Sequence, residues 1–113
     1  MNIIKDTLAN KTVKDSADIM EYLLSQLNYY AFLERDFELQ IFEMNFNGKT
    51  RTKAYREAEQ KRKEYRAYIQ TIHKIIRNNS DISYGDMLKI EQDGAKAMEV
   101  AWELDGKKVE GAI

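Results

Sequence analysis

The stretch SADIMEYLLSQLNYYAFLERDFELQIFEMNFNG, residues 16–48, decides the fold of this chain. Its apolar side chains recur every three or four positions, which is the spacing of one face of an α-helix. The main face consists of Ile19, Leu23, Leu27, Tyr30, Leu33, Phe37, Ile41 and Met44. Other apolar residues widen this face to about half of the helix circumference, more than one neighbouring helix can cover. The stretch therefore predicts a long central helix over 16–46, ended by Asn47-Gly48.

Two further helices are predicted on the C-terminal side of this stretch. Apolar residues at alternating spacings of three and four predict a second helix over about 51–77. The sequence SYGD at 83–86 resembles a capping box and predicts a third helix over about 84–105. Gly94 lies in the apolar arc of that helix and indicates either close approach to another helix or a break. We expect an all-α fold, a small helical bundle in which a long antiparallel hairpin of the first two helices carries the third.

The composition favours uninterrupted helices and limits the chemistry. The 113 residues include no proline and five glycines, and both residue types interrupt helices. The absence of cysteine excludes disulfides and thiolate metal sites. We expect one domain over 1–113, with a minor N-terminal element at 1–14 and a frayed tail at 107–113. Because no stretch resembles a signal peptide or reaches about 18 apolar residues, we expect a cytoplasmic protein without membrane contact.

Charge is unevenly distributed along the chain. Residues 49–77 hold ten of the eighteen basic side chains and three acids, which is a local charge of +7. Residues 1–48 and 81–113 each hold four basic and eight acidic side chains, or −4. The net charge of −1 therefore hides a basic segment. This segment either binds an anionic partner or is neutralised by the acidic helices around it.

Nucleic-acid binding is one interpretation of the basic segment. Phosphates bind such cations, and unstacked bases can stack on the tyrosines that lie between them. In this interpretation the contacts come from the helix over 51–66. The candidate residues are Arg51, Lys53, Arg56, Lys63 and Arg66.

Internal neutralisation is the interpretation that the sequence favours. If the hairpin turns at Asn47-Gly48, Arg62 faces Glu34 and Glu38. These two carboxylates lie four residues apart in the apolar arc of their helix, so they repel each other unless a cation lies between them. We therefore predict a buried ionic cluster of Glu34, Glu38 and Arg62. Such a cluster sets the register of the hairpin rather than adding much stability.

A second apolar strip, with a spacing of seven residues, lies on the side of the first helix away from its main face. Either the third helix covers this strip, or the strip lies at an interface with another chain, where aromatic side chains are enriched. A third helix of about 22 residues cannot cover a first helix of about 30 along its whole length. The predicted protein interface consists of Tyr29, Phe32, Leu39 and Phe46, together with the acidic Asp93, Glu99 and Glu103 of the third helix.

Signatures of catalysis are missing from the sequence. The single histidine, His73, is interpreted as a boundary residue of its helix rather than a ligand or a general base. No glycine-rich phosphate loop is present, and the carboxylate pair Glu34 and Glu38 lacks the Glu-x-x-His partners of metal sites in helical bundles. We therefore predict a protein that is not an enzyme and uses no cofactor or metal.

The function predicted from the sequence is docking on a partner protein. Small helical modules of this size and composition are typically regulatory, inhibitory or adaptor-like, and some are accessory proteins of phages or mobile elements. We also expect this protein to form a homodimer. The alternative is a nucleic-acid-binding protein that uses the basic helix over 51–66.

Overall fold

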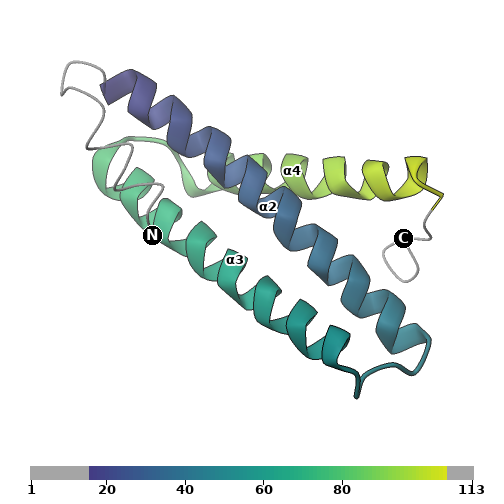
Figure 1. Ribbon diagram of the computed structural model, residues 1–113. Helices are drawn as coiled ribbons and strands as arrows, with labels where there is room; N and C mark the ends of the chain where they lie inside the picture. Colours follow the sequence, from purple (N-terminus) through teal and green to yellow (C-terminus); the bar gives the residue numbers. More distant parts are fainter. Residues whose placement is uncertain (1–15, 107–113) are drawn as a thin grey trace.

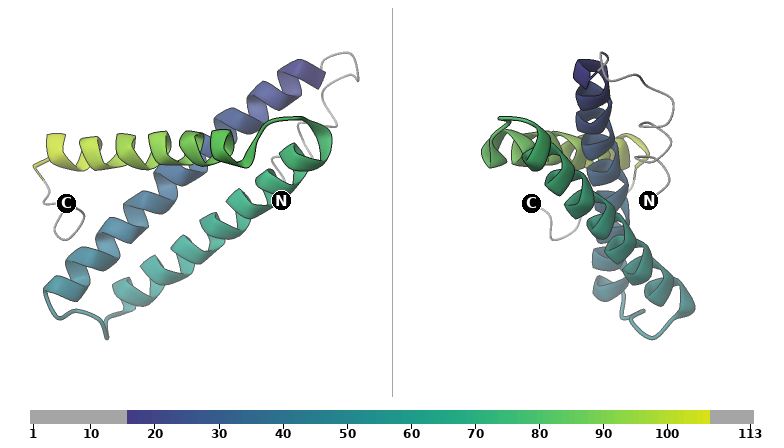
Figure 2. Two further views of the ribbon diagram at one scale, coloured as in Figure 1. Left: turned by 180° about the vertical axis from the view of Figure 1, so that it is seen from behind. Right: turned by 90° about the vertical axis from the view of Figure 1, so that its left-hand side faces the viewer.

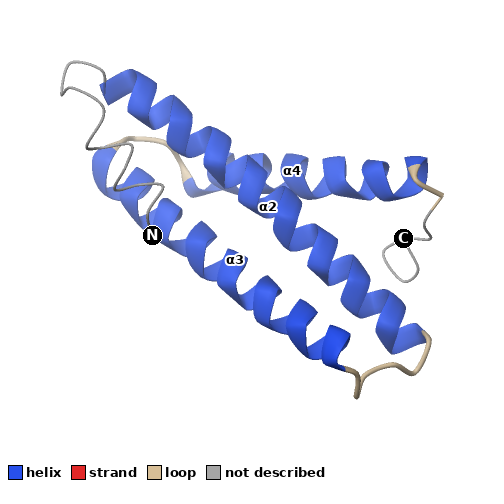
Figure 3. Cartoon of the chain, viewed as in Figure 1, coloured by secondary structure: helices blue, strands red, loops and turns tan. Residues whose placement is uncertain are grey.

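The computed structural model describes residues 16–106, which form three helices (Figure 1). The helices are α2 at Ser16–Phe46, α3 at Lys53–Asn79 and α4 at Tyr84–Leu104. The described part of the chain contains no strand (Figure 3). The predicted all-α bundle is confirmed, and each boundary lies within two residues of its predicted position. The predicted N-terminal element at 1–14 and the tail at 107–113 lie outside the described residues.

Helix α2 lies at the centre of the molecule (Figures 1 and 2). Helix α3 runs antiparallel along one side of α2, and α4 crosses α2 on another side. From the loop that joins them α3 and α4 diverge, so each of them packs mainly on α2. Because α2 has two neighbours, it needs apolar side chains around a wide part of its circumference.

The turn between α2 and α3 occupies residues 47–52. Gly48 has a φ of 70°, in the left-handed region that glycine adopts without strain. The N–H of Lys49 donates to the carbonyl of Met44 at 2.7 Å and closes the end of α2. The side chain of Thr52 then accepts from the N–H of Tyr55 and caps α3. Helix α3 therefore begins two residues later than predicted, which changes the register of the hairpin.

The main hydrophobic core lies where the three helices meet. It consists of Leu23, Leu27, Tyr30 and Ala31 of α2, Ile69, Ile72 and Ile76 of α3, and Met87 of α4. A smaller cluster of Leu39, Met98 and Trp102 joins α2 to the C-terminal part of α4. There Nε1 of Trp102 donates to Oδ1 of Asp36 at 2.8 Å. The two clusters anchor α4 on α2 near both of its ends.

Gly94 allows α4 to approach α2 closely. A Cβ atom at this position would lie 2.2 Å from the backbone carbonyl oxygen of Asn28, so any side chain would collide with α2. The side-chain amide of Asn28 donates to the carbonyl of Ile90 at 3.1 Å and holds the two helices together. Helix α4 continues through Gly94 without a break. Of the two predictions for Gly94, close approach to another helix is therefore confirmed and a break in the helix is wrong.

Candidate functional site

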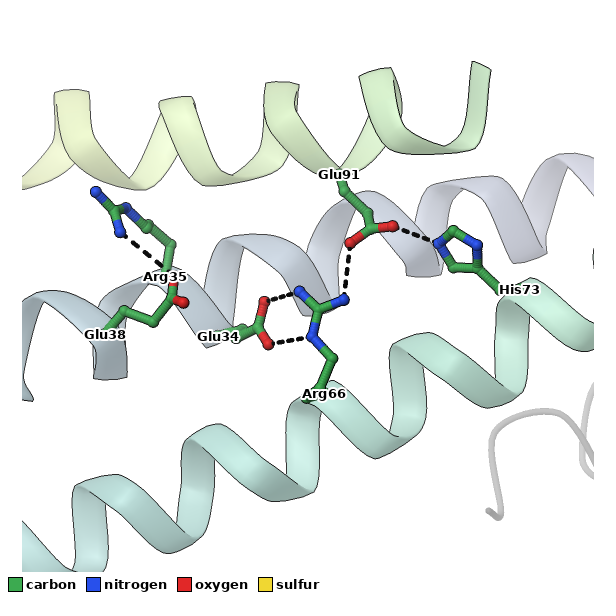
Figure 4. A network of polar contacts seen from close by, with 6 residues as sticks. All are labelled: Glu34, Arg35, Glu38, Arg66, His73 and Glu91. Atoms are coloured by element: carbon green, nitrogen blue, oxygen red, sulfur yellow. Dashed lines mark hydrogen bonds and ion pairs between the residues drawn. The ribbon is translucent and has the colours of Figure 1, made fainter. Parts of the chain in front are cut away.

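Four charged or titratable side chains form a network between the three helices (Figure 4). Arg66 of α3 binds Glu34 of α2 with two hydrogen bonds, from Nε to Oε2 at 2.6 Å and from Nη2 to Oε1 at 2.5 Å. Its remaining nitrogen, Nη1, donates to Oε1 of Glu91 in α4 at 3.1 Å. The other oxygen of Glu91 lies in hydrogen-bond contact with Nε2 of His73. One guanidinium therefore ties α3 to both of the helices packed around it.

Burial dominates the electrostatics of this network. Glu34 is 4% exposed, and burial is the largest cause that raises the pKa of its carboxyl. The charges of Glu38 and Glu91 also raise this pKa, whereas the hydrogen bonds and charge of Arg66 lower it, and the balance is a raised pKa. Burial by itself would lower the pKa of Arg66, but its bonds to Glu34 and the charges of Glu34 and Glu91 raise that pKa overall. A single cation thus serves two buried carboxylates. Of these two carboxylates, His73 contacts only Glu91.

The network corrects the predicted partner of Glu34. The predicted cation was Arg62, whereas the structure places Arg66 there. The reason is the register of the hairpin, since α3 starts at Lys53 rather than at 51 and its side chains meet α2 at later positions. Arg62 is half-buried and forms no ion pair with another described residue.

The cation beside Glu38 also differs from the prediction, since it comes from α2 itself and not from α3. Arg35 lies 3.4 Å from Glu38 and donates through Nε to Glu99 of α4 at 3.0 Å. The predicted cluster of Glu34, Glu38 and Arg62 is therefore replaced by two separate groups, one centred on Arg66 and one on Arg35. The sequence analysis missed Arg66 because it assumed another register of the hairpin, and it missed the contacts of both arginines with Glu91 and Glu99 because it omitted α4.

The predicted apolar strip is only partly available to another chain. Leu39 is 1% exposed because Met98 and Trp102 cover it, and Phe32 packs against the same cluster. Phe46 is 73% exposed. Helix α4 thus covers the strip over most of its length and leaves Phe46 uncovered. The alternative in which the third helix covers the strip holds for Leu39 and in part for Phe32.

The remaining residues of the predicted protein interface differ in their surroundings. Tyr29 is half-exposed and stacks on Phe32, with 6.4 Å between the ring centroids. Asp93 and Glu103 are exposed on α4. Glu99 is engaged by Arg35.

The outer face of α3 carries two cations near each end and one between them. Eight positions at alternating spacings of three and four are all exposed on this face, and we call them the basic stripe. They are Lys53, Arg56, Gln60, Lys63, Ala67, Gln70, Lys74 and Arg77. Five are cations and none is an acid. At 1.5 Å per residue the stripe is about 36 Å long.

Four of the five predicted nucleic-acid contacts face solvent. Arg51 precedes α3, and Nη1 of Arg56 donates to its carbonyl at 3.2 Å. Lys53 lies 3.7 Å from Glu57 in an exposed pair, and Lys63 is exposed. Arg66 is held within the network and is excluded as a free contact. Sequence reasoning stopped at 66 and missed the two last cations of the stripe, although the spacing of three and four continues to them.

A pocket of about 270 Å³ lies at the junction of α3 and α4. Its walls are Arg66, Gln70, His73, Lys74, Arg77, Tyr84, Leu88 and Glu91. The two missed cations, Lys74 and Arg77, therefore belong both to the basic stripe and to this pocket. The stripe thus ends at a concave site.

Comparison of the chain with models of protein families, with curated proteins and with solved structures finds no match in any of the three. Within residues 16–106, no three histidine, cysteine or acidic side chains lie close enough together to hold a metal ion. None of the three described helices is long and apolar enough to cross a bilayer. The functional argument therefore rests on the surface of α3 and the pocket at its end.

Proposed function

We propose that this protein binds nucleic acid through the basic stripe of α3. The observation that carries the proposal is that, of the eight exposed positions of the basic stripe, five hold cations and none holds an acid. Such a row matches the regular negative charge of a phosphate backbone, which supplies most of the affinity of sequence-independent binding. Its length of about 36 Å equals roughly one turn of a duplex or several nucleotides of a single strand.

The alternative account, internal neutralisation, covers only part of the basic segment. Arg66 is neutralised within the fold, and Lys53 and Lys61 pair with acids of α3 itself. Both of those lysine pairs are exposed and bind weakly, so a phosphate can replace the acid. Arg56, Lys63, Lys74 and Arg77 form no ion pair with another described residue. Four of the five cations of the stripe are therefore available to a phosphate without the loss of an ion pair.

The net charge of −1 is compatible with this role because the charges are separated in space. The exposed acids Asp93 and Glu103 belong to α4, whereas the stripe of α3 holds no acid. The exposed Glu57, which lies beside the stripe on α3, pairs with Lys53. A surface of this kind attracts a polyanion to one face and repels it from the others, which orients the encounter. The proposed role is binding alone, without catalysis.

The test is fluorescence anisotropy of labelled single-stranded and duplex oligonucleotides at about 50 and 200 mM salt. If all five cations contact phosphates, affinity falls about 500-fold between these concentrations, because the slope of log K against log salt is about −0.9 per contact. Lys63→Glu weakens binding and reduces that slope by about 1. Lys96→Glu makes the same change of charge on α4 and serves as the matched control. Absence of binding at the lower salt concentration rejects the proposal.

Docking on a protein is a second candidate, favoured by one observation. Four large apolar side chains are exposed in the C-terminal parts of α2 and α4, at the same end of the molecule (Figure 2). They are Phe42, Phe46, Val100 and Leu104. Exposed aromatic and aliphatic side chains of this kind supply the anchors of protein interfaces. The occupant that we propose is a second copy of the chain.

Sedimentation equilibrium of the wild type and of Phe46→Asp tests this second candidate. A dimer that Phe46→Asp dissociates supports it, since the substitution places a charge in the contact. The control is Glu43→Asp, a mild change one turn away on the exposed surface of α2, which should leave the dimer intact. A wild type that stays monomeric at high concentration rejects the candidate without affecting the first one.

A further inference from the structure

The pocket at the junction of α3 and α4 combines cations with an exposed aromatic ring. Lys74 and Arg77 are exposed at its wall on α3, and Tyr84 stands at the first turn of α4 with 63% of its surface exposed. The ring of Tyr84 lies beside the ring of His73, with 5.8 Å between the centroids. Proteins that bind single-stranded nucleic acid combine cations, which contact the phosphates, with exposed aromatic rings, on which the bases stack.

The acid in this pocket is already engaged. One oxygen of Glu91 accepts from Arg66 at 3.1 Å, and the other lies in contact with His73. Both of its oxygens are therefore held by groups of α3, whereas no acid pairs with Lys74 or Arg77 among the described residues. The wall formed by α3 presents a net positive charge to a ligand.

The size of the pocket limits what it can hold. Sites for drug-sized ligands have volumes of about 300–1,000 Å³. At about 270 Å³, this pocket lies just below that range, so it suits a small ligand or one unit of a longer chain. A base within a duplex is covered on both faces by its neighbours and cannot reach Tyr84 without being flipped out, at a cost in free energy. A single strand presents unstacked bases without that cost.

We infer that the nucleic acid bound by the stripe is single-stranded and that the pocket holds one of its nucleotides. The base stacks on Tyr84, and the phosphate lies between Lys74 and Arg77, where the stripe continues the path of the backbone. This inference rests on the proposed function and names the class of nucleic acid. It assigns a binding role to Tyr84, which lies in α4, outside the basic segment at 49–77.

The test compares a labelled single strand of about 12 nucleotides with a hairpin duplex that has the same number of phosphates. The wild type is expected to bind the single strand at least about fivefold more tightly than the duplex, since stacking on one aromatic ring contributes about 1–3 kcal/mol, or about five- to 140-fold. Tyr84→Ala removes this preference and leaves affinity for the duplex unchanged. Tyr84→Phe retains the ring and the preference. Tyr29→Ala removes a half-exposed ring from α2 and is the matched control.

The stripe variant Lys63→Gln separates this inference from the proposed function. It is expected to weaken both probes to the same extent. If the two probes bind equally, or if Tyr84→Ala leaves the single strand unaffected while Lys63→Gln weakens it, the pocket inference is overturned and the proposed function stands. If the wild type binds neither probe, both are overturned. Thermal melts test whether Tyr84→Ala stays folded. The double variant Lys74→Gln with Arg77→Gln tests the pocket independently, because it removes both cations proposed to bind the phosphate.

Discussion

The inner and outer sides of α3 use the same kind of residue for opposite purposes. On the inner side one arginine, Arg66, is bound by Glu34 and Glu91 and joins three helices. On the outer side the five cations of the basic stripe face water, and one of them, Lys53, has an acid beside it. The two sides differ because position on the helix decides which charges meet buried carboxylates. A basic segment in a sequence is therefore a mixture of structural and available cations, and only the packing separates them.

The largest expected effect comes from breaking the inner side. Arg66→Met leaves two carboxylates without their shared cation and should cost about 3 kcal/mol, the lower part of the range for a broken buried pair, because Arg66 is 40% exposed. Arg62→Met is the matched control on the same helix and should change the free energy of unfolding by less than about 0.5 kcal/mol. Urea denaturation measures both variants. Equal costs would contradict the assignment of Arg66 as the structural cation.

A smaller loss of stability is expected when α4 is pushed away from α2. Gly94→Ala places a Cβ atom against the backbone of Asn28, which cannot move aside as a side chain could. The cost should be about 2 kcal/mol, as for overpacking at a tight contact. Gly85→Ala, in the first turn of the same helix, meets only Ser83 Oγ at 3.9 Å. It should be neutral or stabilise the protein by about 0.5 kcal/mol, since alanine favours helix. Thermal melts of the two variants compare the sites directly.

The charge of Glu34 links the inner side to pH. Because burial raises the pKa of this carboxyl above its ordinary 4.5, the folded state favours the protonated form. The stability that this contributes is fully present below pH 4.5 and is lost as pH rises through the pKa of the folded state. The stability of the wild type relative to Glu34→Gln should therefore fall as pH increases from about 4 to 7. Urea denaturation at several pH values measures the difference, and a rise with pH would contradict the dominance of burial.

The fold was predictable because its signals are local. The spacing of apolar residues, the capping residues at 83–86 and the glycine after α2 each act within one or two turns of helix, so the sequence alone placed every helix boundary to within two residues. The burial of Glu34 was also predictable, since a carboxylate within an apolar arc must either be buried or disrupt the helix face.

The partners of the charged residues were not predictable in the same way. Two additional residues in the turn before α3 were enough to place Arg66 instead of Arg62 against Glu34. The position of α4 was also unknown. Glu91 contacts Arg66 and Glu99 contacts Arg35 only because α4 packs on α2 at a particular angle, and the spacing of residues in the sequence does not determine that angle. The pocket beside Tyr84 follows from that same angle. Tertiary geometry, rather than propensity, decides such contacts.

The smallest effect on stability is expected on the outer side. Lys63→Glu and Arg56→Glu each reverse an exposed charge that no described acid pairs with, so each should change the free energy of unfolding by less than about 0.5 kcal/mol. The same variants should lower affinity for nucleic acid, whereas Arg66→Met should lower stability and leave the salt slope of the remaining binding unchanged. Urea denaturation and anisotropy on one set of proteins measure the two properties. If Lys63→Glu unfolds the protein, or if Arg66→Met reduces the salt slope by about 1, then the two sides of α3 are not separate in function. The basic stripe would in that case be part of what holds the bundle together.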